Sequence, residues 1–208
     1  GIYLFEPGAL IEILQGQEED FGRDIIPGMV SQGFDIFVYD YEKENKIQDF
    51  TIEVHDGKRS KILTDRTRDS SYWRDVGSID SYFEASMDLV SVDPLFNLYG
   101  EKWPFRTCQR QLPPSKCIIG GSTHESIVSD GCIISGGAVW RSILSPNVII
   151  EKGAVVEESI IFDDVVIEPG VGVRRAIIDK GTIIEAGASV GYNSDDDIKG
   201  GCTISETG

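Results

Sequence analysis

Residues 127–190 read IVSDGCIISGGAVWRSILSPNVIIEKGAVVEESIIFDDVVIEPGVGVRRAIIDKGTIIEAGASV, and bulky aliphatic residues recur through them at a fixed interval. The steps between successive aliphatics are six, six and five residues, so the cycle repeats every 17 residues. An α-helix needs apolar residues at a period near 3.6 and a half-buried strand at a period of about 2, so neither explains this spacing. The positions expected to point inward are Ile127, Ile133, Val139, Leu144, Ile150, Val156, Ile161, Ile167, Val173, Ile178, Ile184 and Val190.

A hexapeptide repeat is typical of a parallel β-helix, in which each hexad forms one short strand and one corner. Three hexads close a triangular coil, and stacked coils cover one another's ends. Small or turn-forming residues stand three positions after inward aliphatics, where corners require a positive φ. These residues are Asn147, Gly153, Gly170, Gly181 and Gly187. The sequence therefore predicts a solenoid of about four coils of 17 residues.

Composition narrows the possible partners. The formal net charge of −16 argues against a nucleic-acid groove, because such affinity comes largely from Lys and Arg that neutralise phosphates. No run approaches the ~18 apolar residues of a membrane span, so no membrane partner is expected. The four cysteines show no CxxC pairing, which favours reduced thiols and a cytoplasmic protein. They are Cys108, Cys117, Cys132 and Cys202.

The region before the repeat has the pattern of an incomplete α/β domain. Because the chain opens on strand-like Gly1–Phe5 without a Met, we expect a piece of a longer protein. The expected elements are strands at 1–5 and 34–41, helices from Pro7 to Leu14 and at 28–32, a hairpin at 51–55 and 58–63, a polar loop at 66–71 and a helix at 79–89. The predicted domains are 1–92, a Pro-rich linker at 93–114 and the solenoid at 115–208, which ends without a sustained pattern.

Residues 72–77, YWRDVG, form the densest polar and aromatic cluster and lie where a loop meets a helix. Asp75 there could bind a divalent cation, since Mg²⁺ takes one or two protein carboxylates together with substrate phosphates. The alternative is that Asp75 pairs with Arg74 or a helix cap while Trp73 serves packing. The residues alone leave both interpretations open.

Six motifs in this order resemble bacterial glucose-1-phosphate adenylyltransferase, also called ADP-glucose pyrophosphorylase. They are GIYLF at 1–5, DFGRDIIP at 20–27, YWRDVG at 72–77, LYGEKWPFRT at 98–107, VSDGCIISG at 128–136 and RRAIIDK at 174–180. The resemblance covers nearly the whole chain and implies the later part of such a protein: an α/β nucleotidyltransferase domain remnant followed by a left-handed parallel β-helix. It also implies an enzyme, usually a homotetramer, that makes ADP-glucose and pyrophosphate from ATP and glucose 1-phosphate with Mg²⁺.

The resemblance assigns roles to particular residues. Tyr3, Asp20, Phe21 and Trp73 would line the glucose pocket, and Asp75 would hold Mg²⁺ and the sugar phosphate. Core packing is the alternative for Tyr3 and Phe21, and helix capping is the alternative for Asp20. Sugar-phosphate or nucleotide effectors would bind near a basic stretch formed by Arg174, Arg175 and Lys180, for which a solvated solenoid face is the alternative.

Two departures qualify the resemblance. The Gly-rich phosphate loop of the family, with its Arg, second metal aspartate and sugar-phosphate Lys, has no counterpart in these residues, so this polypeptide alone is expected to be inactive. Similar proteins also run more directly to YWRDVG, without the hairpin at 50–63.

Other functions fit less well. A hexapeptide-repeat acyltransferase usually needs a catalytic His at a corner, and the two histidines, His55 and His124, lie outside the full coils. A β-helix zinc hydratase needs three His ligands. A non-catalytic regulatory or scaffolding subunit of the resembled family remains an alternative, since an intact YWRDVG argues against that interpretation without excluding it.

Overall fold

A computed structural model describes residues 1–66 and 70–206 and separates the chain into two compact units, Gly1–Asn45 and Lys46–Gly208. The predicted loop at 66–71 and the end of the chain therefore lie partly outside the described residues. Within the described part, no helix is both long enough and apolar enough to cross a membrane.

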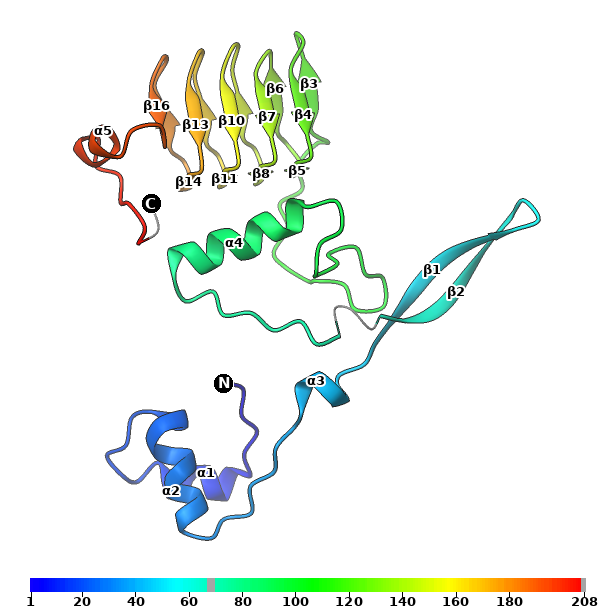
Figure 1. Cartoon of the computed structure of the whole chain (residues 1–208), viewed down its shortest axis with the longest axis vertical. Coiled ribbons are helices and arrows are strands. Elements are labelled where there is room, and N and C mark those ends of the chain that lie inside the picture. Colours follow the sequence, from blue (N-terminus) through cyan, green and yellow to red (C-terminus); the bar gives the residue numbers. More distant parts are fainter. Residues whose placement is uncertain (67–69, 207–208) are drawn as a thin grey trace. The chain divides into compact units, whose positions relative to one another are not determined.

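The second unit is dominated by a parallel solenoid with three faces, as the repeat predicts (Figure 1). Two faces contain five strands and the third contains four, each strand pairing with the equivalent strand of the next coil. The strands are β3 Lys116–Ile118, β4 Ser122–His124, β5 Ile127–Val128, β6 Ile133–Ser135, β7 Ala138–Trp140, β8 Ile143–Leu144, β9 Ile149–Ile150, β10 Val155–Glu157, β11 Ile160–Ile161, β12 Val166–Ile167, β13 Gly172–Arg174, β14 Ile177–Ile178, β15 Ile183–Ile184 and β16 Ser189–Val190.

The core of the solenoid is a column of aliphatic side chains. The inward positions from Val139 to Ile184 are buried as expected. In the first coil the prediction is wrong by one residue, because Val128 and Ile134 occupy the inward register and Ile127 and Ile133 do not. The reason is that this coil is one residue shorter, with Val128 aligned on Leu144 at a spacing of 16. The sequence does not reveal this one-residue difference, because Ile127-Val128 and Ile133-Ile134 are pairs of adjacent hydrophobic residues, either of which could point inward.

The corners confirm the predicted turn residues. Asn147 has φ 65°, and the four predicted glycines have φ between 68° and 76°. Another corner adopts positive φ without glycine, at Glu125, Arg141, Glu158 and Arg175. There a ladder of hydroxyls fastens the coils: Ser142 Oγ accepts from Ser159 N at 3.1 Å, and Ser159 Oγ accepts from Ala176 N at 3.2 Å.

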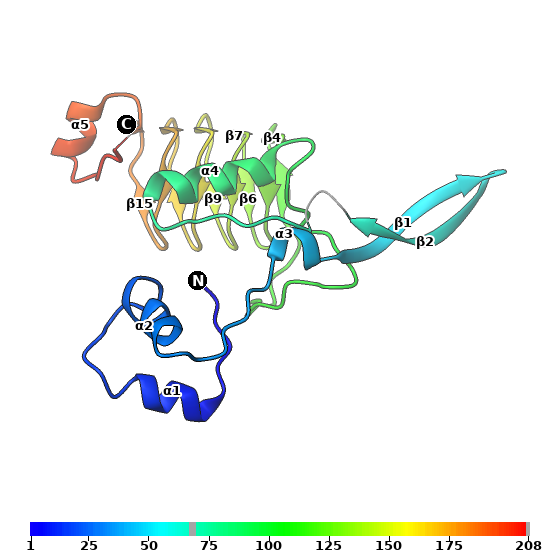
Figure 2. The ribbon, with the colours of Figure 1, turned by 60° about the horizontal axis from the view of Figure 1, so that its bottom comes forward.

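A helix lies beside the solenoid within the same unit (Figures 1 and 2). This is α4, Ile79–Val90, which contacts β8 and brings Tyr82 to 6.4 Å from the ring of Phe162. Ser78 caps the helix through a capping box, in which Ser78 and Ser81 exchange side-chain and backbone hydrogen bonds. After β16, residues expected to have no regular structure form the short helix α5, Ser194–Lys199, because Asn193 caps it and Asp197 folds back onto Gly191 N.

The predicted hairpin is confirmed and is longer than expected. Strands β1, Ile47–His55, and β2, Lys58–Arg66, pair antiparallel over nine positions around Asp56 and Gly57. Both turn residues have positive φ, which matches the right-handed twist of the ribbon.

The first unit contains four short helical segments. They are α1 Pro7–Ile13, a π-helical turn η1 Phe21–Ile25, α2 Ile26–Ser31 and α3 Tyr41–Glu44. The predicted strands at 1–5 and 34–41 are wrong: residues 1–5 and 34–40 form no strand, and most of their side chains are exposed. A strand requires a neighbour to accept its backbone hydrogen bonds, and none of the described residues supplies one.

Candidate functional site

The predicted site residues belong to both compact units, so each group is described within its own unit. In the first unit, Tyr3, Phe5 and Phe21 form an aromatic cluster, with the rings of Tyr3 and Phe21 stacked at 5.6 Å. Tyr3 remains 45% exposed. Aromatic rings so placed offer an apolar face beside a hydroxyl.

Gly22 explains how three predicted sugar-pocket residues come together. A Cβ at position 22 would lie 3.6 Å from both the Tyr3 hydroxyl and Asp20 Oδ1, so the two polar groups converge over this glycine. Phe21 is adjacent in the chain. Gly22 was not among the predicted site residues, and its position directly after the Asp20-Phe21 pair is the sequence signal that could have identified it.

The Asp20 carboxylate also has a local structural role. The side-chain Oδ1 of Asp20 accepts a hydrogen bond from Arg23 N at 2.7 Å. The backbone carbonyl of the same residue accepts hydrogen bonds from the N–H groups of Asp24 and Ile25. The helix-cap alternative is thus confirmed as a contact. It fixes the position of the carboxylate beside Tyr3.

In the second unit, residues 72–77 are held at both ends. The Tyr72 ring packs at 4.8 Å against Phe96, and Arg74 pairs with Glu84 of α4 at 3.7 Å. Asp75 therefore does not pair with Arg74, as one alternative proposed. Trp73 is 61% exposed.

The Asp75 carboxylate lies just before the N-terminus of α4. It folds over Gly77, where an added Cβ would come within 3.4 Å of Oδ1 and 3.5 Å of Oδ2. Among the described residues Asp75 has no hydrogen bond or ion pair. An exposed carboxylate without such a partner is available for a cation.

A magnesium ion would fit Asp75 only as part of a larger set of ligands. Within residues 1–66 and 70–206, no three His, Cys, Asp or Glu side chains gather closely enough to hold a metal. Mg²⁺ commonly takes one or two carboxylates and completes its octahedron with phosphates and water. Asp75 therefore suits an ion that arrives with a phosphorylated substrate.

The linker at 93–114 is anchored to the hairpin by a residue that the sequence did not single out. Asp49 is 6% exposed and accepts from the backbone N–H groups of Phe50, Glu101 and Lys102, and it pairs with Arg66 at 3.1 Å. Led by the Phe50 N–H, these donors hold the pKa of Asp49 below its usual range. A side chain at Gly100 would collide with this ion pair.

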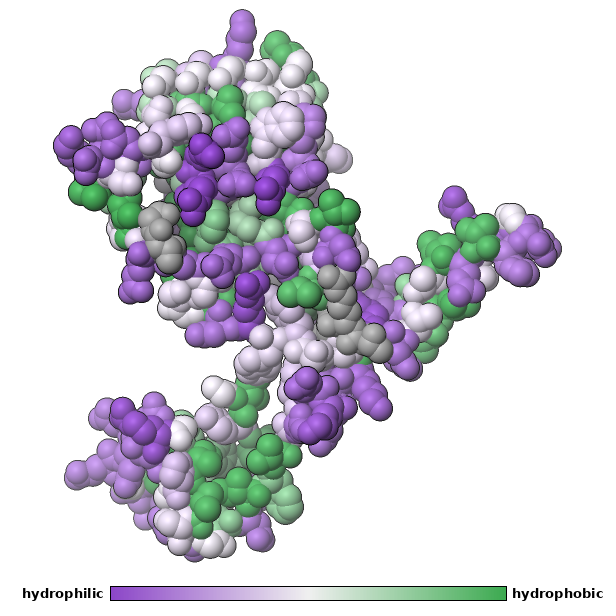
Figure 3. Space-filling view, viewed as in Figure 1, coloured by the Kyte–Doolittle hydropathy of each residue, from purple (hydrophilic) through white to green (hydrophobic). Residues whose placement is uncertain are grey.

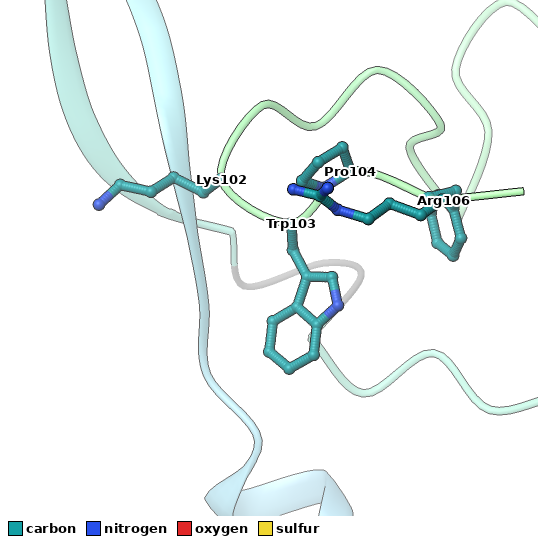
Figure 4. A pocket seen from close by; sticks show the side chains of 5 residues that line it. Lys102, Trp103, Pro104 and Arg106 are labelled. Atoms are coloured by element: carbon teal, nitrogen blue, oxygen red, sulfur yellow. The ribbon is translucent and has the colours of Figure 1, made fainter.

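Next to this anchor is a shallow pocket lined by Lys102, Trp103, Pro104, Phe105 and Arg106 (Figure 4). The side chain of Lys102 reaches toward the hairpin, with its Nζ 5.4 Å from the Phe50 ring centroid. Phe105 contacts Phe96 edge-on at 5.3 Å, whereas Trp103 is mostly exposed.

The linker is also attached to the solenoid. Arg110 Nη1 donates to both oxygens of Asp164 at 2.9 and 2.8 Å, and Asn147 donates to Asp164 Oδ1 at 2.7 Å. The Asn147 and Arg110 hydrogen bonds lower the pKa of Asp164.

The predicted regulatory cations occupy two corners of one coil. Arg174 ends β13 and Arg175 forms the corner after it, whereas Lys180 follows β14 at the next corner. All three are exposed, and none has an ion pair with any residue that the structure describes. Arg174 borders a hollow lined also by Trp140, Arg141, Glu157 and Glu158.

The two histidines occupy different surroundings. His55 lies at the exposed tip of the hairpin. His124 stacks on the Trp140 ring at 3.9 Å, one coil away along the same face.

Comparisons with known proteins match the two parts of the chain separately. Residues 1–92 match the nucleotidyl transferase family, and residues 113–208 match the GlmU-like C-terminal hexapeptide family. Glucose-1-phosphate adenylyltransferase of Trichlorobacter lovleyi is 40% identical over 100% of this chain, and that of Cutibacterium acnes is 40% identical over 100%. The chain is a homologue of glucose-1-phosphate adenylyltransferases. The predicted resemblance is thereby confirmed.

The matched glucose-1-phosphate adenylyltransferases are considerably longer than this chain. It spans about half of the two proteins just named, 49% and 48% of their lengths. The Corynebacterium jeikeium enzyme is 41% identical over 76% of this chain, which corresponds to 36% of that protein. The nucleotidyl transferase match and the hexapeptide match confirm the predicted fold class of an α/β nucleotidyltransferase remnant followed by a left-handed parallel β-helix.

Proposed function

We propose that this chain is part of a cytoplasmic enzyme that forms ADP-glucose and pyrophosphate from ATP and glucose 1-phosphate. The single observation that carries the proposal is the similarity to glucose-1-phosphate adenylyltransferases along the whole chain. The unpaired Asp75 carboxylate supplies a group suited to the chemistry.

In this proposal the chain's own residues bind and orient the sugar phosphate. Tyr3, Asp20, Phe21 and Trp73 are the residues assigned to the glucose ring. Asp75 would hold Mg²⁺, and the ion would supply charge neutralisation at the reacting phosphates. The phosphate oxygen of glucose 1-phosphate then attacks the α-phosphorus of ATP in line, and pyrophosphate leaves.

This kind of reaction depends mainly on positioning and electrostatics, so small displacements of Asp75 should be costly. The contacts that support its position are the Tyr72–Phe96 packing and the Arg74–Glu84 pair. The domain division at 1–92, 93–114 and 115–208 belongs to the same proposal, as does a homotetramer.

The test uses the complete protein and measures pyrophosphate release that requires both ATP and glucose 1-phosphate. Asp75→Asn should lower kcat by about 10²-fold or more, because it removes a charge that acts on the transition state. The matched control is Asp130→Asn, an exposed aspartate on the solenoid, which should leave kcat unchanged. Full activity in Asp75→Asn would refute the assignment, and release without glucose 1-phosphate would refute the substrate.

The regulatory part of the proposal concerns the corner cations. A sugar-phosphate or nucleotide effector would be bound by Arg174, Arg175 and Lys180, since guanidinium and ammonium groups suit phosphate. Lys180→Glu in the complete enzyme should weaken the effector response while leaving activity without effector intact. Unchanged activation curves would contradict this role.

A further inference from the structure

The β1–β2 hairpin is a long ribbon on which β1 exposes a row of apolar side chains. Nine residues per strand give a ribbon about 30 Å long at roughly 3.3 Å per residue, and every residue from 51 to 60 is exposed. Alternation places Phe50, Ile52 and Val54 on one face, where their cross-strand partners on β2 are Leu63, Lys61 and Arg59. Ile52 is 64% and Val54 66% exposed, and Figure 3 shows hydrophobic side chains along the ribbon.

An isolated two-stranded ribbon is marginally stable in water, and three or more strands with an apolar face are more favourable. The Asp49–Arg66 pair and the linker amides fasten its base, and the Lys61–Glu101 ion pair adds one attachment further along β2. The rest of the ribbon has no third strand among the described residues. A partner that adds strands would therefore stabilise it.

The two edges of the ribbon differ in their ability to accept such a partner. Exposed edges are usually blocked by charged residues, lysine above all. Strand β2 carries Lys58, Arg59 and Lys61, whereas β1 has no Lys or Arg from Ile47 to His55. The edge of β1 is thus the unprotected one.

The backbone of β1 is oriented for pairing at this edge. Because His55 and Lys58 flank a two-residue turn, the ladder directs the backbone groups of Ile52 and Val54 away from β2. The N–H of Phe50 also points outward and is taken by Asp49 Oδ1 at 2.7 Å. The groups of Ile52 and Val54 remain available to a neighbouring strand.

We propose that two copies of this chain associate by antiparallel pairing of their β1 edges, with Ile52 of each copy at the two-fold axis. The ribbon sequence is self-complementary in that register. Phe50 lies opposite Val54 of the partner subunit, and Thr51 lies opposite Glu53 of the partner subunit. At the end of the pairing, Asp49 lies opposite His55 of the partner subunit, so no like charges meet.

The pairing produces a four-stranded antiparallel sheet in which the two central strands present Phe50, Ile52 and Val54 from each copy on one face. The outer strands flank this apolar strip with Leu63, Lys61 and Arg59. The outer edges of the sheet are the two β2 strands with their lysines and arginine, which stop further strand addition at this interface. Charge also favours a second copy of this chain as the partner. Residues 46–66 contain five Lys or Arg and four Asp or Glu, a net charge of +1 in a chain whose net charge is −16, so the ribbons do not share the strong acidity that repels two copies elsewhere.

The test compares Ile52→Lys with Leu63→Lys in the full chain by analytical ultracentrifugation. Ile52→Lys places two ammonium groups opposite each other at the axis and should weaken dimerisation by about tenfold or more. Leu63→Lys adds the same charge to the same face but on the outer strand, so it should leave edge pairing nearly intact. Equal loss in both variants would instead indicate face-to-face stacking and would overturn the proposal.

A mixture tests the two-fold register directly. Ile52→Glu alone should also fail to dimerise, and an equimolar mixture of Ile52→Lys and Ile52→Glu should recover association, because opposite charges then meet at the axis. Failure to recover would refute the register.

Hydrogen exchange provides a readout that other interfaces do not obscure. In the unmodified chain the Ile52 and Val54 amides should become protected as concentration rises, and in Ile52→Lys they should exchange freely at every concentration. Free exchange in the unmodified chain at high concentration would refute edge pairing, whatever the mass of the assembly.

Discussion

The solenoid and the first 45 residues use similar apolar sequence and reach opposite outcomes. In the solenoid each strand finds its partner 16 or 17 residues away, in the next coil, so the repeat supplies its own hydrogen bonds and its own core. Residues 1–5 and 34–40 are also apolar and extended, yet none of the described residues pairs with them. Alternation of side chains thus specifies a strand only where a neighbouring backbone exists.

The largest expected effect tests the register of the first coil, where the sequence was misread. Ile134 is 1% exposed in the core, whereas Ile133 lies outside it. Ile134→Ala should lower the free energy of unfolding by about 2–5 kcal/mol through lost burial and a residual cavity, and Ile133→Ala by less than about 1 kcal/mol. Urea unfolding followed by circular dichroism measures both. Equal losses would restore the register read from the sequence.

A second prediction separates steric from conformational reasons for glycine in the solenoid. A Cβ at Gly137 would lie 2.8 Å from Glu151 O and 3.0 Å from Ala154 O, so Gly137→Ala should destabilise by about 1–3 kcal/mol. Gly170 has open space but φ 72°, and Gly170→Ala should cost only about 1 kcal/mol. The midpoints of urea unfolding of the two variants give the comparison. A larger loss at Gly170 would show that backbone conformation dominates.

The third prediction concerns acid and the anchor of the hairpin. The pKa of Asp49 is lowered in the folded chain, so its stabilising contribution is complete above the ordinary aspartate pKa and is lost as pH falls through the folded value. Asp49→Asn should therefore lower Tm at pH 7, and the difference from the unmodified protein should shrink as the pH drops below about 4. Thermal unfolding across pH measures this. A Tm difference between the two proteins that grows as the pH falls would contradict a lowered pKa of Asp49.

The smallest effect is expected in the first unit. Leu4 is fully exposed in this structure, so Leu4→Ser in this chain should change the free energy of unfolding by no more than about 0.5 kcal/mol. The internal comparison is Met29→Ala, at a buried position, which should cost about 2 kcal/mol or more within this unit. Thermal unfolding of both variants provides the measurement. A large effect at Leu4 would show that residues 1–5 are packed.

The sequence predicts a structural feature well when the residues that form the feature lie close together in the chain. The 17-residue period predicted the solenoid, and two strand-like runs only two residues apart predicted the hairpin, because each signal and its partner lie close in the chain. The single-residue shortening before Val139 could not be seen, since Ile127-Val128 and Ile133-Ile134 are doublets that satisfy either register. The Asp49 anchor was missed because its partners Glu101 and Lys102 are about 50 residues distant and bind through the backbone, which carries no sequence signal.

The same reasoning applies to the candidate site. The residue type of Asp75 and its sequence neighbours identified it as a candidate. Only the structure shows that Arg74 forms an ion pair with Glu84 instead of with Asp75. Asp20 was assigned two roles, and the structure shows the cap while the sugar contact stays a prediction. The assignments of Tyr3, Phe21 and Trp73 likewise stay predictions.

The contrast between a self-pairing solenoid and an unpaired N-terminal segment is tested most directly by hydrogen exchange along the whole chain. We expect strand amides in residues 139–184 to exchange only through global unfolding, and amides in residues 1–5 and 34–40 to exchange with almost no protection. Strong protection of those two segments would contradict the account, because it would reveal strand partners that the structure does not contain.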